Sequence, residues 1–180
     1  MEMTITEALA KTKTLKNRIE KRRSSLMEYL CRDKQLTDPM SKHGGSPEYI
    51  DNEQQGIKDL EEELVKIRVA IQEANMNTLL PIQTWEHTVA YWLNWRREIA
   101  EGNKQFLLSM AAYISRYREK AAEKGYTISR DAQESEPKQI LVNVDEAELN
   151  AKVDKMQQLL GDLDGKLSLL NATVTIEIPD

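Results

Sequence analysis

Cysteine is almost absent from this chain of 180 residues, which contains Cys31 alone. A single cysteine cannot form an internal disulfide bond, and such sparse use is typical of proteins in a reducing compartment. The chain also lacks a run of about 18 consecutive apolar residues, which a membrane-spanning helix would need. Its first residues lack the basic and apolar regions of a signal peptide. We therefore expect a protein made in a cytoplasm, without a membrane span.

Aromatic residues are scarce too, at 6% of the chain, whereas charged residues make up 31%. A chain this polar can bury a core only if its apolar residues are gathered on stripes. The composition therefore favours long two-sided helices over a compact globular enzyme. The formal net charge of −5 argues against a general attraction to nucleic acid, which requires a basic face.

Residues that could carry catalysis or bind a metal ion are scattered. Cys31, His43 and His87 lack the paired spacing of a structural zinc site. The consecutive acids at 61–63 point around a helix instead of converging. The glycines at 44–45 are not followed by the Gly-Lys-Ser/Thr of a phosphate-binding loop. We therefore expect no enzyme, no cofactor and no metal site.

Two segments on either side of a loop at residues 37–47 repeat apolar residues at spacings of four and three, the period of one helical face. In the first segment these residues are Ala8, Thr12, Leu15, Ile19, Arg22, Leu26 and Tyr29. In the second they are Ile50, Ile57, Leu60, Leu64, Ile67, Ile71 and Ala74. The pattern predicts two helices of about 27–30 residues packed as an antiparallel hairpin. Thr6 and Ser46 are the predicted N-caps.

The two segments carry opposite charge, which is the simplest reason for them to pair. Residues 1–34 contain nine Lys and Arg against five Asp and Glu, and residues 48–74 contain three against eight. Arg22 interrupts the first stripe and Glu53 the second. We expect the Arg22 stem to pack while its guanidinium reaches a carboxylate. A nucleic-acid contact is the alternative for the basic segment, but no aromatic residues interleave to stack on bases.

A third long helix is predicted after a break around Pro81, with Thr84 as its N-cap. Its stripe consists of Trp85, Val89, Trp92, Arg96, Ile99, Phe106, Met110, Tyr113 and Tyr117. Glycine and asparagine at 102–103 predict a kink or a split. Lys124-Gly125 predicts its end, because glycine is favoured just beyond a helix C-terminus.

This third segment contains all three tryptophans within eleven residues. One interpretation is a core face packed against the hairpin. The other is an interface anchor, since Trp, Tyr and Arg dominate the binding energy of protein interfaces. Under the second interpretation the partner-binding residues are Trp92, Trp95, Arg96 and Arg97.

The C-terminal part alternates between strand and helix patterns. Residues 139–144 alternate as a strand does, Asp145 can cap a helix that continues to Leu170, and residues 172–178 alternate again. Two strands are too few to be stable alone. We therefore expect these strands either to pair with another subunit or to donate an edge to a partner's sheet, with the last one supplying the added strand. Its predicted partner-binding residues are Val174, Ile176 and Ile178.

Together these patterns predict a mainly α protein. Residues 1–128 form a helical hairpin and a third helix, residues 129–138 a linker, and residues 139–180 a strand-helix-strand extension. The predicted function is structural: to bridge or oligomerise protein subunits.

Several motifs resemble small tailed-bacteriophage proteins. They are the opening Thr-Ile-Thr-Glu-Ala-Leu-Ala-Lys at 4–11 with its continuation to Arg22, Gly-Gly-Ser-Pro-Glu-Tyr-Ile at 44–50, Ile-x-x-Ala-Asn at 71–75, and Trp-Leu-x-Trp-Arg-Arg-Glu at 92–98. The resemblance covers residues 4–100. It implies a virion component or assembly protein, with copies of itself or other virion proteins as partners and without catalytic residues.

The predicted hairpin followed by Ala-Asn-x-Asn-Thr at 74–78 is also distantly similar to the septicolysin-like family of bacterial helical proteins. This second resemblance implies a cytoplasmic regulator or a pore-forming effector instead of a virion protein.

Overall fold

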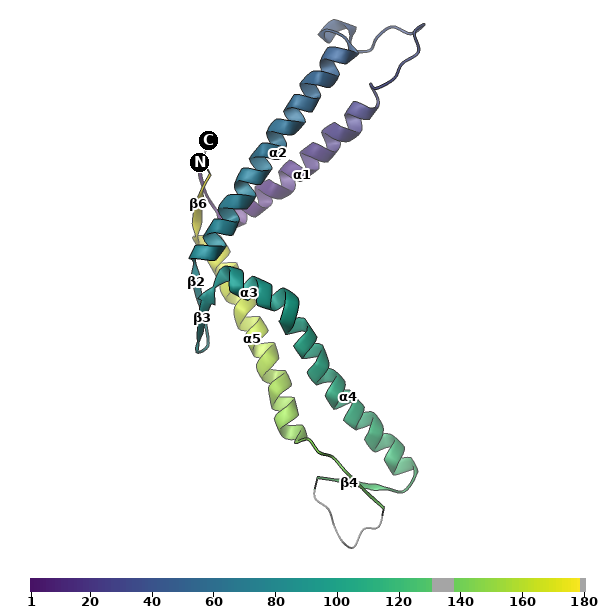
Figure 1. The fold of residues 1–180 in the computed structure, drawn as a ribbon, viewed down its shortest axis with the longest axis vertical. Coiled ribbons are helices and arrows are strands. Elements are labelled where there is room, and N and C mark those ends of the chain that lie inside the picture. Colours follow the sequence, from purple (N-terminus) through teal and green to yellow (C-terminus); the bar gives the residue numbers. More distant parts are fainter. Residues whose placement is uncertain (131–137, 179–180) are drawn as a thin grey trace. The chain divides into compact units, whose positions relative to one another are not determined.

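The computed structural model describes residues 1–130 and 138–178 and confirms a mainly α fold (Figure 1). The chain forms two compact units, one of Met1–Asn77 with Ser168–Asp180 and one of Thr78–Leu167. This division differs from the predicted one, which joined the first three helices. The predicted linker at 129–138 falls mostly on residues 131–137, which lie outside the described residues.

The first unit contains the predicted helical hairpin, made of α1 (Ile5–Met27) and α2 (Ser46–Asn77) (Figure 1). The buried residues of α1 that belong to the predicted stripe are Ala8, Thr12, Leu15, Ile19 and Leu26. The N-cap of α1 is Thr4, so the prediction of Thr6 is wrong. The Thr4 hydroxyl accepts from the Glu7 N–H at 3.2 Å, and the Glu7 carboxylate accepts from the Thr4 N–H at 2.8 Å. The helix begins earlier because Ile5 is already a core residue.

Ion pairs join the two helices and confirm the predicted charge complementarity. Lys11 Nζ lies 2.6 Å from a Glu63 oxygen, and Arg23 Nη2 lies 2.5 Å from a Glu61 oxygen.

The two residues that interrupt the stripes pair with each other, since Arg22 Nε lies 3.7 Å from a Glu53 oxygen. A Cβ at Gly56 would lie 2.2 Å from Arg22 Nη1. The absence of a side chain at Gly56 therefore leaves room for the guanidinium.

Asp38 organises the loop between the helices. Its Oδ1 accepts from the Ser46 hydroxyl at 2.6 Å and from the Met40 N–H at 2.9 Å, and its Oδ2 accepts from the Ser46 N–H at 3.0 Å. These bonds, those from Ser46 above all, lower the pKa of Asp38 to about 2. Gly44 and Gly45 follow with φ of 84° and 95°, a backbone region that favours glycine. The loop therefore delivers Ser46 to the start of α2 in a fixed geometry.

A two-stranded antiparallel sheet joins the two ends of the described chain. Strand β1 (Glu2–Thr4) pairs with β6 (Thr175–Glu177), with Met3 opposite Ile176. Ile176 and Ile178 are buried. The prediction that β6 lacks a partner within the chain is therefore wrong. Its partner β1 is only three residues long and gave no recognisable pattern.

The second unit begins with a β-hairpin of β2 (Leu79–Ile82) and β3 (Trp85–Thr88). Leu80 and Ile82 alternate as its buried residues, and Gln83 adopts a φ of 54° in the turn. The helix predicted to start at Thr84 starts instead at α3 (Val89–Trp95). Its N-cap is Thr88, whose hydroxyl accepts from the Tyr91 N–H at 3.2 Å.

Helix α3 continues through a π-helical turn, η2 (Arg96–Ala100), into α4 (Glu101–Glu123). The irregularity predicted at residues 102–103 thus lies just before them. Gly125, with a φ of 70°, ends the helix as predicted, and the Tyr126 N–H bonds to the Ala121 carbonyl at 3.0 Å.

The remaining elements are the parallel pair β4 (Thr127–Ser129) and β5 (Gln139–Leu141), followed by α5 (Glu146–Thr173). Asp145 caps α5 as predicted, because its Oδ1 accepts from the N–H groups of Ala147 and Glu148 at 2.9 and 3.2 Å. The predicted stripe supplies buried residues of this helix, namely Leu149, Val153, Leu163, Leu167 and Leu170.

Within the second unit, α4 and the preceding turn lie beside α5 (Figure 1). Arg96 Nη1 lies 2.6 Å from an Asp164 oxygen, and Arg118 bonds to Glu146. The tryptophan-bearing helix was predicted to pack on the α1–α2 hairpin. Within its own unit it contacts the β2–β3 hairpin through Trp92, and the helix that continues it contacts α5 through Arg96 and Arg118.

Candidate protein-interaction surface

Trp92, a predicted partner-binding residue, is a core residue of the second unit. Its side chain is 2% exposed, and its Nε1–H donates to the Leu80 carbonyl at 2.8 Å. Trp92 is therefore a core residue, although one interpretation expected this core face to pack against the α1–α2 hairpin. Its burial leaves it little surface with which to anchor a partner. The physical reason is that the β2–β3 hairpin, absent from the sequence-based prediction, covers it.

The other predicted residues on this segment also contact groups of their own unit. Trp95 is half-buried with its ring edge-on to Trp92, and Arg96 pairs with Asp164. Arg97 is largely exposed and bonds to its helix neighbours Glu98 and Asn94. Trp95, Arg96 and Arg97 thus lie together, but only Arg97 presents most of its side chain to solvent.

The predicted residues of the last strand lie in the first unit. Val174 is half-buried, whereas Ile176 and Ile178 are 5% and 7% exposed. Because the two isoleucines are covered by the chain itself, the prediction that they bind a partner is wrong.

Beside the tryptophan core lies an exposed aromatic cluster that sequence reasoning missed. The His87 ring stacks on Tyr91 with centroids 3.9 Å apart, and Trp85, 60% exposed, lies next to His87. Placing Trp85 in a helix hid this cluster, since a strand brings Trp85 and His87 to the same side.

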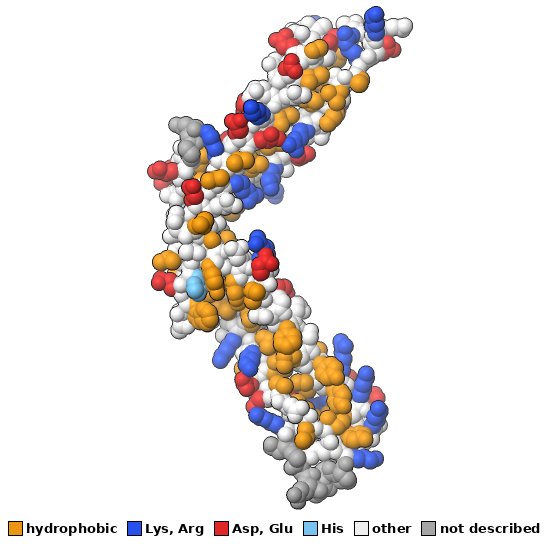
Figure 2. Space-filling model, in the orientation of Figure 1, with side chains coloured by type: hydrophobic (Ala, Val, Ile, Leu, Met, Phe, Trp, Pro, Cys, Tyr) orange, Lys and Arg blue, Asp and Glu red, His pale blue; other side chains and the backbone are white. Residues whose placement is uncertain are grey.

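Several large apolar side chains of the second unit that are exposed or half-buried follow one line along α4. We call this line the α4 seam and define it as Phe106, Met110, Tyr113 and Tyr117. Phe106, Tyr113 and Tyr117 are 65%, 68% and 47% exposed, and Met110 is half-buried. Figure 2 shows hydrophobic side chains gathered along this part of the molecule.

The seam remains exposed because α4 carries a second apolar arc that faces its own unit. Leu107 and Ile114 are half-buried and Ala121 is buried. At 100° per residue, Leu107 lies about 100° around the helix from Phe106. This double arc was visible in the sequence. An apolar face wider than a single neighbouring helix can cover is the signal that could have identified the surface.

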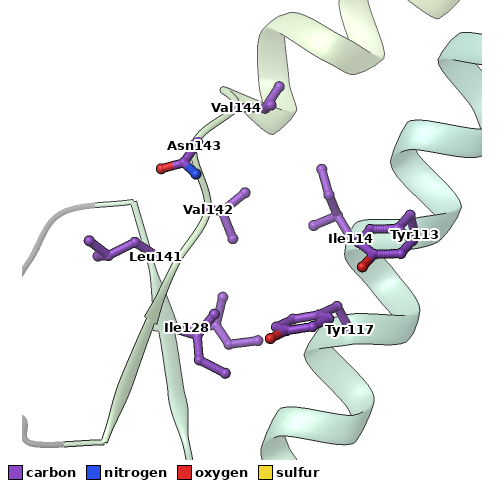
Figure 3. Close-up of a pocket in the computed structure, with 9 residues that line it drawn as sticks. Tyr113, Ile114, Tyr117, Ile128, Leu141, Val142, Asn143 and Val144 are labelled. Carbon is purple, nitrogen blue, oxygen red and sulfur yellow. The ribbon is translucent and has the colours of Figure 1, made fainter.

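A shallow apolar groove extends the seam toward the C-terminal end of α4 (Figure 3). Tyr113, Ile114 and Tyr117 of α4 face Ile128 and Val142 from the segments around β4 and β5, and the cavity has a volume of about 360 Å³. The Tyr113 and Tyr117 rings stack with centroids 6.1 Å apart. The seam and the groove share Tyr113 and Tyr117 and thus form one continuous, mainly apolar surface.

The groove is lined mainly by aliphatic and phenolic side chains. Across the described parts of the chain, no group of three His, Cys, Asp or Glu side chains could hold a metal ion. Cys31 is exposed on the loop of the first unit. Among the described helices, none has both the length and the apolar character needed to cross a membrane.

Comparison with known proteins adds no relative. Neither a family model, nor a curated protein, nor a solved structure matches the chain.

Proposed function

We propose that this chain is a non-enzymatic assembly protein that binds other protein chains through the α4 seam and the adjoining groove. The observation that supports the proposal is the exposure of Phe106, Tyr113 and Tyr117 along one face of α4. Regularly spaced apolar residues on one helical face are the usual means by which helices bind one another.

The size of the surface supports the same conclusion. An aromatic side chain buries about 150–250 Å² when covered, so the exposed fractions of the three rings leave about 350 Å² uncovered. The largest apolar patch on a typical monomer measures about 300–600 Å² and is often functional. Three rings alone reach that range, before Met110 and the groove are counted.

The location that we propose is a phage particle or its assembly pathway, with other copies of the chain or other virion proteins as partners. This part of the proposal rests on the sequence motifs that resemble tailed-bacteriophage proteins.

A matched pair of substitutions tests the proposal. Phe106→Ser removes a side chain that is 65% exposed on the seam, and Leu169→Ser removes one that is 66% exposed on α5. In extracts of producing cells we expect the wild type and Leu169→Ser to elute in a complex larger than 20.7 kDa, and Phe106→Ser to elute as a smaller species. Equal helicity by circular dichroism would show that both variants are folded. Elution of all three at 20.7 kDa would contradict the proposal.

The alternative is a septicolysin-like effector, in which the seam would meet lipid. Lys120 and Lys124 lie near the C-terminal end of the seam, as a helix that binds an anionic surface requires. Flotation with vesicles that contain phosphatidylserine separates the two functions. The assembly proposal expects the protein to stay with the soluble fraction.

A further inference from the structure

We propose that the α4 seam is covered by the α4 seam of a second copy of this chain, with the two helices antiparallel. This inference deepens the proposed function, on which it rests, by naming the partner. It is carried by the charges beside the seam and by the spacing of its residues.

The residues beside the seam suit a second copy of this chain better than a partner whose surface is strongly charged. On the side of the seam away from Leu107 and Ile114, the exposed residues are Gln105, Ser109, Ala112 and Arg116. Charged residues in such flanking positions normally select a partner of opposite charge. Arg116 is the one charged residue on this stretch of the flank, and no acidic residue accompanies it. A second copy that places Arg116 near an uncharged residue is therefore not repelled.

The spacing of the seam residues permits a symmetric register. They follow one another at intervals of four, three and four, which is the a/d pattern of a coiled coil. In an antiparallel pair whose two-fold axis passes between residues 111 and 112, Phe106 lies opposite Tyr117 of the second copy, and Met110 lies opposite Tyr113. The four seam residues of each copy then form four layers without a gap.

The basic residues that follow decide the orientation. A parallel pair would place Lys120, the next residue of the seam's spacing, against Lys120 of the second copy, and like charges in contact are destabilising. The antiparallel register places Lys120 opposite Asn103 and Arg116 near Ser109. It also places the positive N-terminal end of each helix beside the negative C-terminal end of the other, which is the favourable arrangement of the two dipoles.

The exposed area is of the size that a dimer needs. The three rings of two copies would cover about 700 Å². A specific interface buries about 1,200–2,000 Å² in total. The rings alone account for about half of the lower figure, and Met110 and Ile99, which is 47% exposed, add to it.

The first experiment measures the mass of the purified chain by light scattering as its concentration rises. We expect a change from 20.7 kDa to twice that value for the wild type and for Leu169→Ser. We expect Phe106→Ser to remain at 20.7 kDa over the same range. A wild type that stays at 20.7 kDa, or a Phe106→Ser variant that dimerises equally well, would overturn the inference.

The second experiment tests the orientation with spin labels on a Cys31→Ser background. Single labels at Ser109→Cys and Glu123→Cys avoid the seam residues. In the antiparallel register two labels at 109 are separated by about 8 Å along the helix axis and two labels at 123 by about 35 Å. A parallel pair would give short distances at both sites, and that result would overturn the antiparallel arrangement.

These outcomes separate the inference from the function on which it rests. If the purified chain stays monomeric while the complex in extracts still depends on Phe106, the second copy is excluded and a different protein occupies the seam. If neither the purified dimer nor the complex in extracts depends on Phe106, both are wrong.

Discussion

Replacing Trp92 with phenylalanine tests whether the core of the second unit is organised as described. Trp92 is 2% exposed, and its indole N–H donates to the Leu80 carbonyl at 2.8 Å. Phenylalanine keeps an aromatic ring but removes the donor and part of the buried surface. The link between α3 and the β2–β3 hairpin should therefore weaken.

Two contributions set the size of the effect. The smaller ring gives up roughly 50 Å² of buried apolar surface, which corresponds to about 1.3 kcal/mol at about 25 cal/mol per Å². The lost hydrogen bond contributes about 0.5–1.5 kcal/mol. We therefore expect Trp92→Phe to lower the free energy of unfolding of the second unit by about 2–3 kcal/mol.

The assay is urea denaturation followed by tryptophan fluorescence. All three tryptophans lie in the second unit, so the signal reports that unit. Trp85→Phe is the matched control, because Trp85 is 60% exposed, and we expect it to change the free energy by less than about 0.5 kcal/mol. Equal shifts for the two variants would refute the assignment of Trp92 to the core.

Three further predictions concern the first unit. Thr4→Ala should lower the free energy of unfolding by about 1 kcal/mol in thermal unfolding, because it removes the N-cap of α1, whereas Thr6→Ala should change it very little. A larger loss for Thr6→Ala than for Thr4→Ala would show that Thr6 is the N-cap. The pKa of Asp38 is lowered from 3.8 to about 2, so the stability that its ionised form contributes is fully present above about pH 4 and is lost as the pH falls through 2. In acid titrations the stability difference between wild type and Asp38→Asn should therefore narrow from pH 4 to pH 2; a constant difference would argue against these bonds. Arg22→Leu with Glu53→Leu should leave the hairpin equally or more stable, since a partly exposed pair 3.7 Å apart contributes only about 0–1 kcal/mol and apolar residues would complete both stripes. A fall in melting temperature would show that the ion pair contributes more than this.

Local chemistry made the helices of this chain predictable. Stripes of apolar residues at spacings of four and three identified the helical hairpin. An acidic residue that can accept from the first N–H groups of a helix, Asp145, identified the start of α5. The pairing of Arg22 with Glu53 was foreseeable too, because each interrupts its own stripe. These features depend on residues within a few turns of one another or on a simple match of charge.

The sheets were not predictable, because their pairing depends on distant residues. Strand β1 has three residues and acquires its meaning only from β6, which lies at the other end of the chain. The β2–β3 turn at Gln83 has neither Asn-Gly nor Asp-Gly, the usual signals of a two-residue hairpin. Because the β1–β6 sheet and the β2–β3 hairpin were not predicted, Ile176 and Trp92 were assigned to partner binding, although the chain itself buries both.

The α4 seam was visible as a pattern, but its exposure was not. The sequence places Phe106, Tyr113 and Tyr117 on one face, and the same helix presents Leu107 and Ile114 on another. Which of two apolar faces is covered within the chain depends on where α5 lies, and this is a tertiary property. The tryptophans provide the interface signal in the sequence instead. A large apolar side chain is also readily buried in a core, and this is what happens to Trp92.

The measurement that bears most directly on the account is photo-crosslinking in producing cells. A benzophenone amino acid is placed at Phe106, at Tyr113, or at Ser115, an exposed residue on the opposite side of α4. If another chain covers the seam, covalent adducts to a protein chain form from the first two positions and none forms from Ser115. Adducts of equal yield from all three positions, or adducts from none of them, would contradict the claim that another chain covers the seam.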